Sequence, residues 1–188
     1  MGISIIGIDP TKEQEVTTLK KRVNIGNFLT KNSASAIIGK GIAKTLKLKL
    51  NDEIVILSQG ADGSIANDLF KVQGIINSKS KTPDDQIIYL SLTKAQEFLA
   101  LENRIHELAI VLNSAQSPRS FSKDLSLKLS KKFSKIEVSS WQIVEKDFYK
   151  AMLADQKGDI IAQFIFTIIV AIGVLNTVLM SSLERTRE

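Results

Sequence analysis

The chain has 188 residues, 44% of them hydrophobic, with no cysteine and a formal net charge of +5. These values fit one or two compact domains, and the absence of cysteine excludes disulfides and thiolate metal sites. The excess of Lys and Arg is spread along the chain with few aromatic residues, which argues against nucleic-acid binding and favours an anionic lipid head group as a neighbour.

The first strand is predicted over residues 3–8, which are rich in isoleucine and end at Asp9 and Pro10. Asp is a favourable N-cap and Pro a favourable first helical residue, so a short helix should begin here. The elements predicted next are a turn or loop, a short strand and a helix, over residues 24–31, 35–38 and 39–48 respectively.

A β-hairpin is predicted in the middle of the chain. Residues 54–57 form an apolar run, residues 59–64 contain two glycines, and residues 65–76 return to an apolar pattern. The elements predicted after the hairpin are an exposed loop, a strand, a helix and a strand, over residues 79–85, 87–90, 94–101 and 105–112 respectively.

A basic helix is predicted to begin at Pro118. Its apolar residues fall four positions apart, which places them in one helical stripe. These residues are Phe121, Leu125, Leu129 and Phe133. Lysines lie off the stripe, and we expect their face to be solvated rather than a binding surface. A short strand is predicted after this helix, over residues 136–138.

An amphipathic helix is predicted over residues 139–158. Ser139 and Gln142 have the spacing of a capping box, and no proline or glycine interrupts the chain until Gly158. Apolar residues recur along it at spacings of three and four. These residues are Trp141, Val144, Phe148 and Met152. We interpret this helix as a stalk that continues into the segment after it.

A transmembrane helix is predicted over residues 159–183, because no charged residue occurs between Asp159 and Glu184. At about 1.5 Å per residue, this run covers a hydrocarbon core of roughly 30 Å. A buried helix of a soluble core is the alternative interpretation, but such helices are usually shorter and amphipathic.

The orientation of this helix is predicted from its flanks. Arg185 and Arg187 follow the apolar run, so the positive-inside rule places that end in the cytoplasm and residues 1–158 outside. Lysines on the other flank oppose this orientation.

Within the span, small residues recur at i, i+4 and i+8, a pattern that lets a second helix approach closely. These residues are Gly173, Thr177 and Ser181, and Asn176 adjoins them. An amide that faces lipid is costly, so we predict that this face packs against a neighbouring transmembrane helix.

Enzyme signatures are weak. Residues 39–41, Gly-Lys-Gly, have the composition of a phosphate-binding loop but lack the preceding Gly and the following Ser or Thr that a P-loop needs. His106 is the sole histidine and cannot form an ordinary zinc site without further ligands. We therefore predict no catalytic, metal-binding or cofactor-binding residue, and a protein that is not an enzyme.

The pieces Leu-Asn-Thr, Leu-Met-Ser and Glu-Arg-Thr-Arg-Glu occur in register within residues 172–188. They closely resemble the second transmembrane helix and following turn of MacB/FtsX-type ABC transporter permeases. Residues 6–10, Ile-Gly-Ile-Asp-Pro, and residues 37–39, Ile-Ile-Gly, are similar to parts of the outer domain of that family. The resemblance covers nearly the whole chain, more loosely in the middle.

The resemblance implies a bacterial inner-membrane permease with four spans, whose outer domain lies between the first and second. The first span, the start of the outer domain and the last two spans would then lie outside this chain. Such permeases work in the bilayer as dimers with a second permease subunit and a separate cytoplasmic ABC ATPase. ATP would be bound by that partner, so no cofactor is expected here. The residues expected nearest to the ATPase are Glu184, Arg185, Arg187 and Glu188.

We therefore predict an α+β fold with a mixed-sheet extracytoplasmic domain over residues 1–138. The stalk helix over 139–158 would run into the transmembrane helix over 159–183, and a cytoplasmic segment would begin at 184–188. The predicted function is to couple ATP hydrolysis to the extraction or export of cargo such as lipoproteins. A periplasmic or outer-membrane protein is a further expected partner, and nucleic acid is not expected to be one. The alternative is a single-span membrane-anchored binding or adaptor protein with an extracytoplasmic receptor domain.

Overall fold

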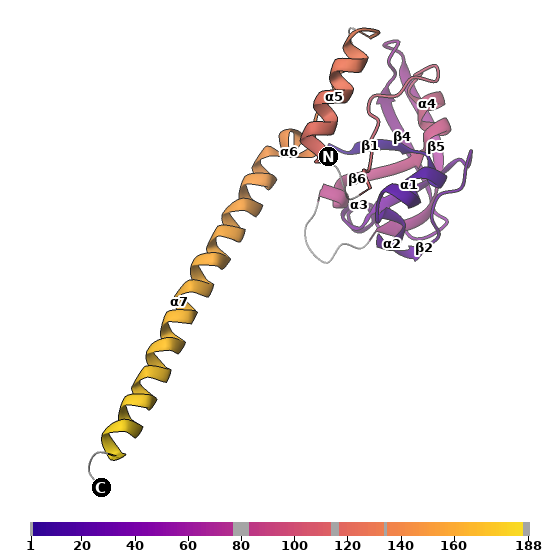
Figure 1. The fold of residues 1–188 in the computed structure, drawn as a ribbon. Coiled ribbons are helices and arrows are strands. Elements are labelled where there is room, and N and C mark those ends of the chain that lie inside the picture. The colour runs from indigo at the N-terminus through magenta and orange to yellow at the C-terminus, as the bar shows by residue number, and fades with distance from the viewer. Residues whose placement is uncertain (1, 77–82, 114–116, 134, 186–188) are drawn as a thin grey trace. The chain divides into compact units, whose positions relative to one another are not determined.

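The computed structural model describes residues 2–76, 83–113, 117–133 and 135–185. The chain divides into two units, Met1–Val111 and Leu112–Glu188, which are described separately below. The first unit contains a mixed sheet with short helices, and the second contains helices, one of them very long (Figure 1). The predicted α+β fold is therefore confirmed.

The first unit is built on a six-stranded sheet. Its strands are β1 (Ser4–Ile8), β2 (Val23–Gly26), β3 (Ser35–Gly39), β4 (Glu53–Gln59), β5 (Ile65–Ile76) and β6 (Ile87–Ser91). Its helices are α1 (Pro10–Val16), α2 (Leu19–Arg22), α3 (Lys40–Leu46) and α4 (Leu92–Phe98), with a 3₁₀ turn, η1, at Pro83–Gln86.

The strand order is β1-β6-β3-β5-β2, and β4 also pairs with β5. β1 is parallel to β6 and β3 is parallel to β5, whereas the β3–β6, β2–β5 and β4–β5 pairs are antiparallel. The long strand β5 bonds to β3 along one edge. Along its other edge it bonds first to β4, through Ile65–Lys71, and then to β2, through Gly74–Ile76. The predicted hairpin is confirmed as β4 and β5.

Strand β2 lies where a loop was predicted, over residues 24–31, so that prediction is wrong at its start. The chain can pair there because Gly26 adopts φ +86 and lies so close to β5 that a Cβ atom would be 2.3 Å from the Gln73 carbonyl oxygen. The register of β3 against β5 shifts at this point, since Ala36 is opposite Val72 but Ile37 is opposite Gly74. This bulge is a long-range feature that local composition does not reveal.

The side chain of the bulged residue, Gln73, connects three segments. Its amide nitrogen donates to the Phe28 carbonyl oxygen at 2.7 Å, and its oxygen accepts from the Ser35 hydroxyl on β3. Ser35 is 7% exposed, so this bond satisfies a polar group that would otherwise be costly to bury. The loop that follows β2 is thereby held to the sheet.

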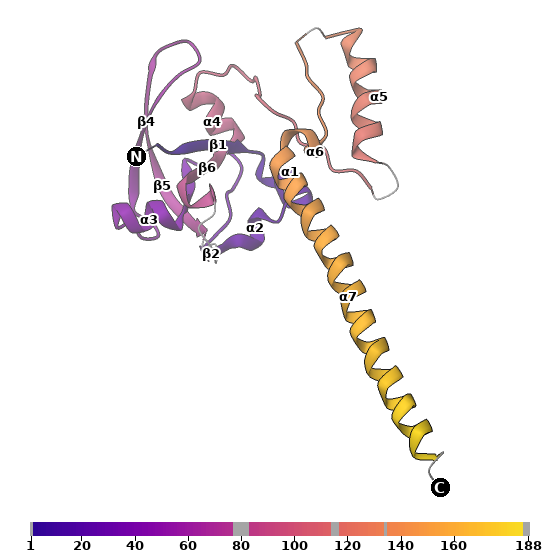
Figure 2. The same cartoon turned by 90° about the vertical axis from the view of Figure 1, so that its left-hand side faces the viewer.

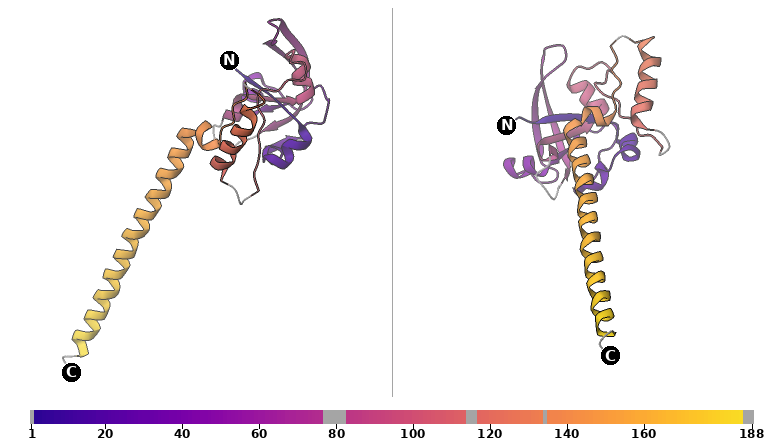
Figure 3. Two further views of the ribbon diagram at one scale, coloured as in Figure 1. Left: turned by 45° about the horizontal axis from the view of Figure 1, so that its top comes forward. Right: turned by 60° about the vertical axis from the view of Figure 1, so that its left-hand side comes forward.

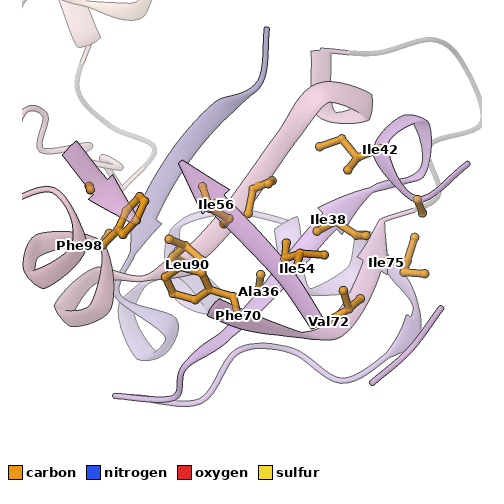
Figure 4. Packing of buried hydrophobic residues seen from close by; sticks show 14 residues of the cluster. Ala36, Ile38, Ile42, Ile54, Ile56, Phe70, Val72, Ile75, Leu90 and Phe98 are labelled. Atoms are coloured by element: carbon orange, nitrogen blue, oxygen red, sulfur yellow. The ribbon is translucent and has the colours of Figure 1, made fainter. Parts of the chain in front are cut away.

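Strand β3 lies at the centre of the sheet and is buried on both faces. Because side chains alternate along a strand, Ala36 and Ile38 point into one core and Ile37 into the other. The larger core receives α3 and α4 and includes a T-shaped contact between Phe70 and Phe98, with centroids 5.6 Å apart (Figure 4). The smaller core includes residues of β1, α2, β5 and β6, namely Ile8, Leu19, Ile76 and Tyr89.

Local interactions determine where helix α1 begins and where helix α3 ends. Asp9 caps α1, since its carboxylate accepts from the amides of Thr11 at 3.0 Å and Lys12 at 3.4 Å, as predicted for this N-cap. Helix α3 ends at Leu46, before the predicted limit of 48, because Lys47 adopts a left-handed conformation with φ 55. The next amide, that of Leu48, returns to the Ala43 carbonyl at 2.9 Å.

Two predicted strands are wrong. Residues 105–112 and 136–138 have the apolar composition of strands, but neither pairs with a strand among the described residues. Ile105, Leu108 and Ile110 are exposed. A strand requires hydrogen-bonding partners as well as a suitable composition. Of the loop predicted over 79–85, residues 79–82 lie outside the described part of the chain.

The second unit contains α5 (Pro118–Ser130), α6 (Trp141–Val144) and α7 (Lys146–Arg185), seen from other directions in Figures 2 and 3. Helix α5 begins at the predicted proline. On it, Ser122 is buried and Phe121, Leu125 and Leu129 are half-buried, in accord with the predicted apolar stripe. The prediction of Phe133 as the fourth member is wrong, because the helix ends at Ser130 and Phe133 is 44% exposed. Helix α7 has 40 residues and continues through Gly158 without a break.

Replacing Phe70 with Ala should lower the free energy of unfolding by about 3–5 kcal/mol, because removal of a fully buried ring leaves a cavity. Urea unfolding of the chain in detergent, followed by circular dichroism, measures the change. Leu57→Ala on the adjacent strand is the control, since Leu57 is 69% exposed, and should change the free energy by no more than about 0.5 kcal/mol. Equal effects of the two substitutions would contradict the placement of Phe70 in the core.

Candidate membrane helix and its elbow

Helix α7 is long enough to cross a bilayer and extend beyond it. Its 40 residues span roughly 60 Å at about 1.5 Å per residue, against about 30 Å for a hydrocarbon core. Among the described residues, one helix meets the length and composition of a membrane span; it covers Lys146–Ser182, with a mean hydropathy of 2.3 in its apolar window. The residues predicted as the span therefore form one uninterrupted helix.

The surface of α7 is apolar where a soluble helix would be polar. Along the span the large side chains are exposed, for example Phe164 at 68% and Val170 at 63%. Exposed apolar patches of this extent are rare in soluble monomers. In a bilayer these side chains meet lipid tails, and the backbone polar groups are satisfied within the helix.

The small-residue stripe predicted within the span lies on α7 as expected from helical spacing. A Cβ atom at Gly173 would meet no atom within 4 Å, so the surface there is open. The Thr177 hydroxyl donates to the Gly173 carbonyl oxygen at 2.9 Å, which satisfies it inside the helix. Asn176 and Ser181 lie on exposed positions of α7 beside them. The role of these residues in helix packing stays a prediction.

The chain turns at Glu145, just before α7. This residue has φ −98 and ψ 51, outside the helical region, and separates α6 from α7. Its amide donates to the Trp141 carbonyl at 2.8 Å, and its carbonyl accepts from the Tyr149 amide at 2.9 Å, so backbone bonds continue on both sides. We refer to residues 140–149 as the elbow.

The predicted stalk helix over 139–158 is thus in two pieces. Trp141 and Val144 lie on α6, while Phe148 and Met152 lie on α7, and all four are exposed. Residues 146–158 are continuous with the span, as predicted. The break arises from the backbone conformation of one residue, Glu145. The spacing of apolar residues along several turns does not change at a single residue, and the sequence therefore did not reveal the break.

The elbow brings together side chains that the sequence did not single out. The rings of Trp141 and Tyr149 meet edge to face, with centroids 5.4 Å apart and an interplanar angle of 86°. The guanidinium carbon of Arg119, from α5, lies 5.3 Å from the centre of the Tyr149 ring. Tyr149 falls outside the apolar spacing of the stalk, and Arg119 is distant in sequence, so no local signal marks either.

The residues predicted to face the ATPase lie at the end of the chain. Glu184 and Arg185 are the last residues of α7, and Arg187 and Glu188 lie outside the described residues. Their predicted role in coupling is considered below as a proposal.

Three buried side-chain atoms of the described residues lack a hydrogen-bond partner, namely Ser91 Oγ, Ser140 Oγ and Gln142 Oε1. Two shifted pKa values have local causes. The Ser64 hydroxyl, at 2.6 Å, holds the pKa of the Asp62 carboxyl below its usual range, and a bond to Glu97 raises the pKa of Lys94. Within the described ranges, no three His, Cys, Asp or Glu side chains gather as a metal site would require. His106 is exposed on a segment without secondary structure.

A shallow cavity of about 290 Å³ lies beside the bulge of β5. Its lining is Gly26, Asn27, Ser35, Leu50, Asn51, Lys71 and Gln73. Ser35 and Gln73 already bond to each other, which makes this region a structural junction of the sheet.

Comparison with protein families gives a match over much of the chain. Residues 2–127 match the model of the MacB-like periplasmic core domain, which is more than half of the chain. The matched region contains the whole mixed sheet and most of α5, whereas α6 and α7 follow it. Comparison with curated proteins finds no match.

Single cysteines can test whether α7 spans a bilayer, since the chain has no cysteine of its own. In liposomes that hold the chain, a membrane-impermeant maleimide should label Lys150→Cys and should fail to label Val170→Cys, whose thiol would lie among lipid tails. Both variants should be labelled after the liposomes are dissolved in denaturing detergent. Labelling of position 170 in intact liposomes would show that α7 is not inserted.

Proposed function

The chain belongs to the MacB-like periplasmic core domain family, as part of a MacB/FtsX-type ABC transporter permease, and from this premise we propose that it transmits ATP-driven motion to an extracytoplasmic domain. The motor is a separate cytoplasmic ATPase, and the cargo is a substrate such as a lipoprotein that is extracted or exported. The observation that carries the proposal is the unbroken course of α7 from Lys146 to Arg185.

A continuous helix suits this role because its backbone bonds resist bending. Proline, a π-bulge or a glycine pair would be the usual causes of a kink, and the helix passes through Gly158 without one. A displacement at the cytoplasmic end of α7 is therefore carried to the elbow. In this proposal, residues 1–138 form the outer domain, 139–158 the stalk, 159–183 the span and 184–188 the start of the cytoplasmic segment.

The cytoplasmic end supplies the contact with the ATPase in this proposal. Its residues are Glu184, Arg185, Arg187 and Glu188. Charged side chains give such contacts specificity and orientation. ATP is bound by the partner, and this chain carries no cofactor.

The small-residue face of α7 supplies a contact within the membrane. A backbone that is accessible at Gly173 lets a second helix approach closely, and the Asn176 amide can bond across the interface. We propose that this face packs against another helix of the dimeric permease. A periplasmic or outer-membrane protein that receives the cargo is a further partner in this scheme.

A single-span binding or adaptor protein is the second candidate function. The exposed apolar surface of α7 is compatible with either, because both require insertion in the bilayer. The two differ in their response to ATP. A receptor binds its ligand without an ATPase, whereas a permease depends on one.

Reversing the charge of the cytoplasmic end tests the coupling. In the full-length permease with its ATPase in liposomes, Arg185→Glu with Arg187→Glu should lower permease-stimulated ATP hydrolysis by about tenfold, as expected for the loss of contacts worth about 1.4 kcal/mol. The matched control, Lys146→Glu with Lys150→Glu, changes charge at the other end of α7 and should leave hydrolysis near its normal rate. Full hydrolysis by the first variant would argue against the proposed coupling residues.

Replacing Gly173 with Leu tests the packing face. The substitution meets no clash within the chain, so the helix should insert normally, but its association with a partner helix should weaken by about tenfold. Co-purification of two differently tagged permease copies from membranes measures association. Val174→Leu, on the adjoining face, is the control and should associate normally. If both variants associate alike, the packing surface lies elsewhere on α7.

A further inference from the structure

Three helices of the second unit meet at one aromatic ring. Tyr149 lies in the first turns of α7 and is half-buried, unlike its exposed neighbours Phe148 and Lys150. Trp141 of α6 meets it edge to face, with centroids 5.4 Å apart. Arg119 of α5 lies over it at 5.3 Å. The ring is therefore shared by α5, α6 and α7.

Both contacts depend on the charge distribution of the ring. An aromatic ring is negative over its face and positive at its edge, which favours a perpendicular neighbour and attracts a cation to the face. The phenol hydroxyl of Tyr149 is needed for neither contact. Phenylalanine at this position would preserve the arrangement, whereas an aliphatic side chain would remove it.

The position of Arg119 on its helix is a second argument that its contact with Tyr149 is specific. Arg119 is in the first turn of α5, a helix of 13 residues. The N-terminus of a helix carries partial positive charge, so a cation there is normally unfavourable. The electron-rich face of Tyr149 offsets this repulsion, which makes the ring a specific partner for Arg119.

The backbone does not continue as a helix from α5 into α7. Residues 131–140 connect α5 to α6 without helix or strand in their described part, and Glu145 breaks the helix between α6 and α7. The backbone path from α7 to α5 therefore passes through segments that are neither helix nor strand where the structure describes them. A side-chain contact between α5 and α7 bypasses them.

We propose that Arg119 and Tyr149 are positioning residues that join α5 to the first turns of α7, with Trp141 as the supporting ring. The joint makes α5 move with the membrane helix as one body. The effect of the joint on transport rests on the proposed function, because α5 would follow a motion of α7. The joint itself is a property of this chain and needs no ATPase.

Spin-label distances in the full chain test the joint. The chain has no cysteine, so K123C on α5 and A151C on α7 give a unique pair of labels at exposed positions. In lipid nanodiscs, the chain and its Tyr149→Phe variant should show one narrow distance distribution. Tyr149→Leu and Arg119→Gln should lose it and give a broad one. Phe148→Leu, at the exposed neighbour, should retain the narrow distribution.

The fluorescence of Trp141 provides a second measurement, because it is the single tryptophan of the chain. The indole is 41% exposed in the presence of the Tyr149 ring. Tyr149→Leu should expose more of it to water and shift its emission to longer wavelength, and Tyr149→Phe should leave the emission unchanged. Circular dichroism verifies that each variant keeps its helix content. A narrow distance distribution and unshifted emission in Tyr149→Leu would overturn the proposal.

The consequence for transport is measured separately, in the full-length permease with its ATPase. Tyr149→Leu should lose ATP-driven release of cargo, and Tyr149→Phe should retain it. Retained release by Tyr149→Leu would overturn the role of the joint in coupling. Failure of the unmodified permease to respond to ATP would instead refute the proposed function, while the label distances, obtained without ATPase, would still decide whether the joint exists.

Discussion

A peptide group inside a bilayer has no water to bond with, so each N–H and C=O of a spanning segment must be satisfied within that segment. Helix α7 meets this requirement along its whole apolar length, and even the hydroxyls of Thr167 and Thr177 bond to carbonyls of the preceding turn. The same bonds that make insertion possible make the helix stiff. Its mechanical role in the proposed function follows from the requirement that the bilayer imposes.

The mixed sheet of the first unit is held together by strand pairing and by two hydrophobic cores. β3 is buried on both faces, and β5 pairs with β3 along one edge and with β4 and β2 along the other. The bulge at Gln73 and its bonds to Ser35 and Phe28 tie the adjacent loop to the sheet. Two cores on opposite faces give the unit its rigidity.

At the elbow, the continuous helix α7 begins and side-chain contacts connect it to α5 and α6. The backbone turns at Glu145, and the helices on either side are related through side chains. Tyr149 takes part in contacts with both Trp141 and Arg119, each of a kind that depends on orientation. The connection between α5, α6 and α7 at this point is therefore made by side chains around one ring.

Features that depend on near neighbours in the chain could be predicted from the sequence alone: the uncharged run that forms the span, the Asp9 cap, the β4–β5 hairpin and the α+β character. The resemblance of the last residues to a permease helix also led to the right family. The strand order, the pairing of β2, the unpaired state of residues 105–112 and the contact of Arg119 with Tyr149 emerged only from the tertiary structure. Periodicity and capping report what a segment favours by itself, whereas pairing and packing depend on which distant segment meets it, and that choice is made by the whole chain as it folds.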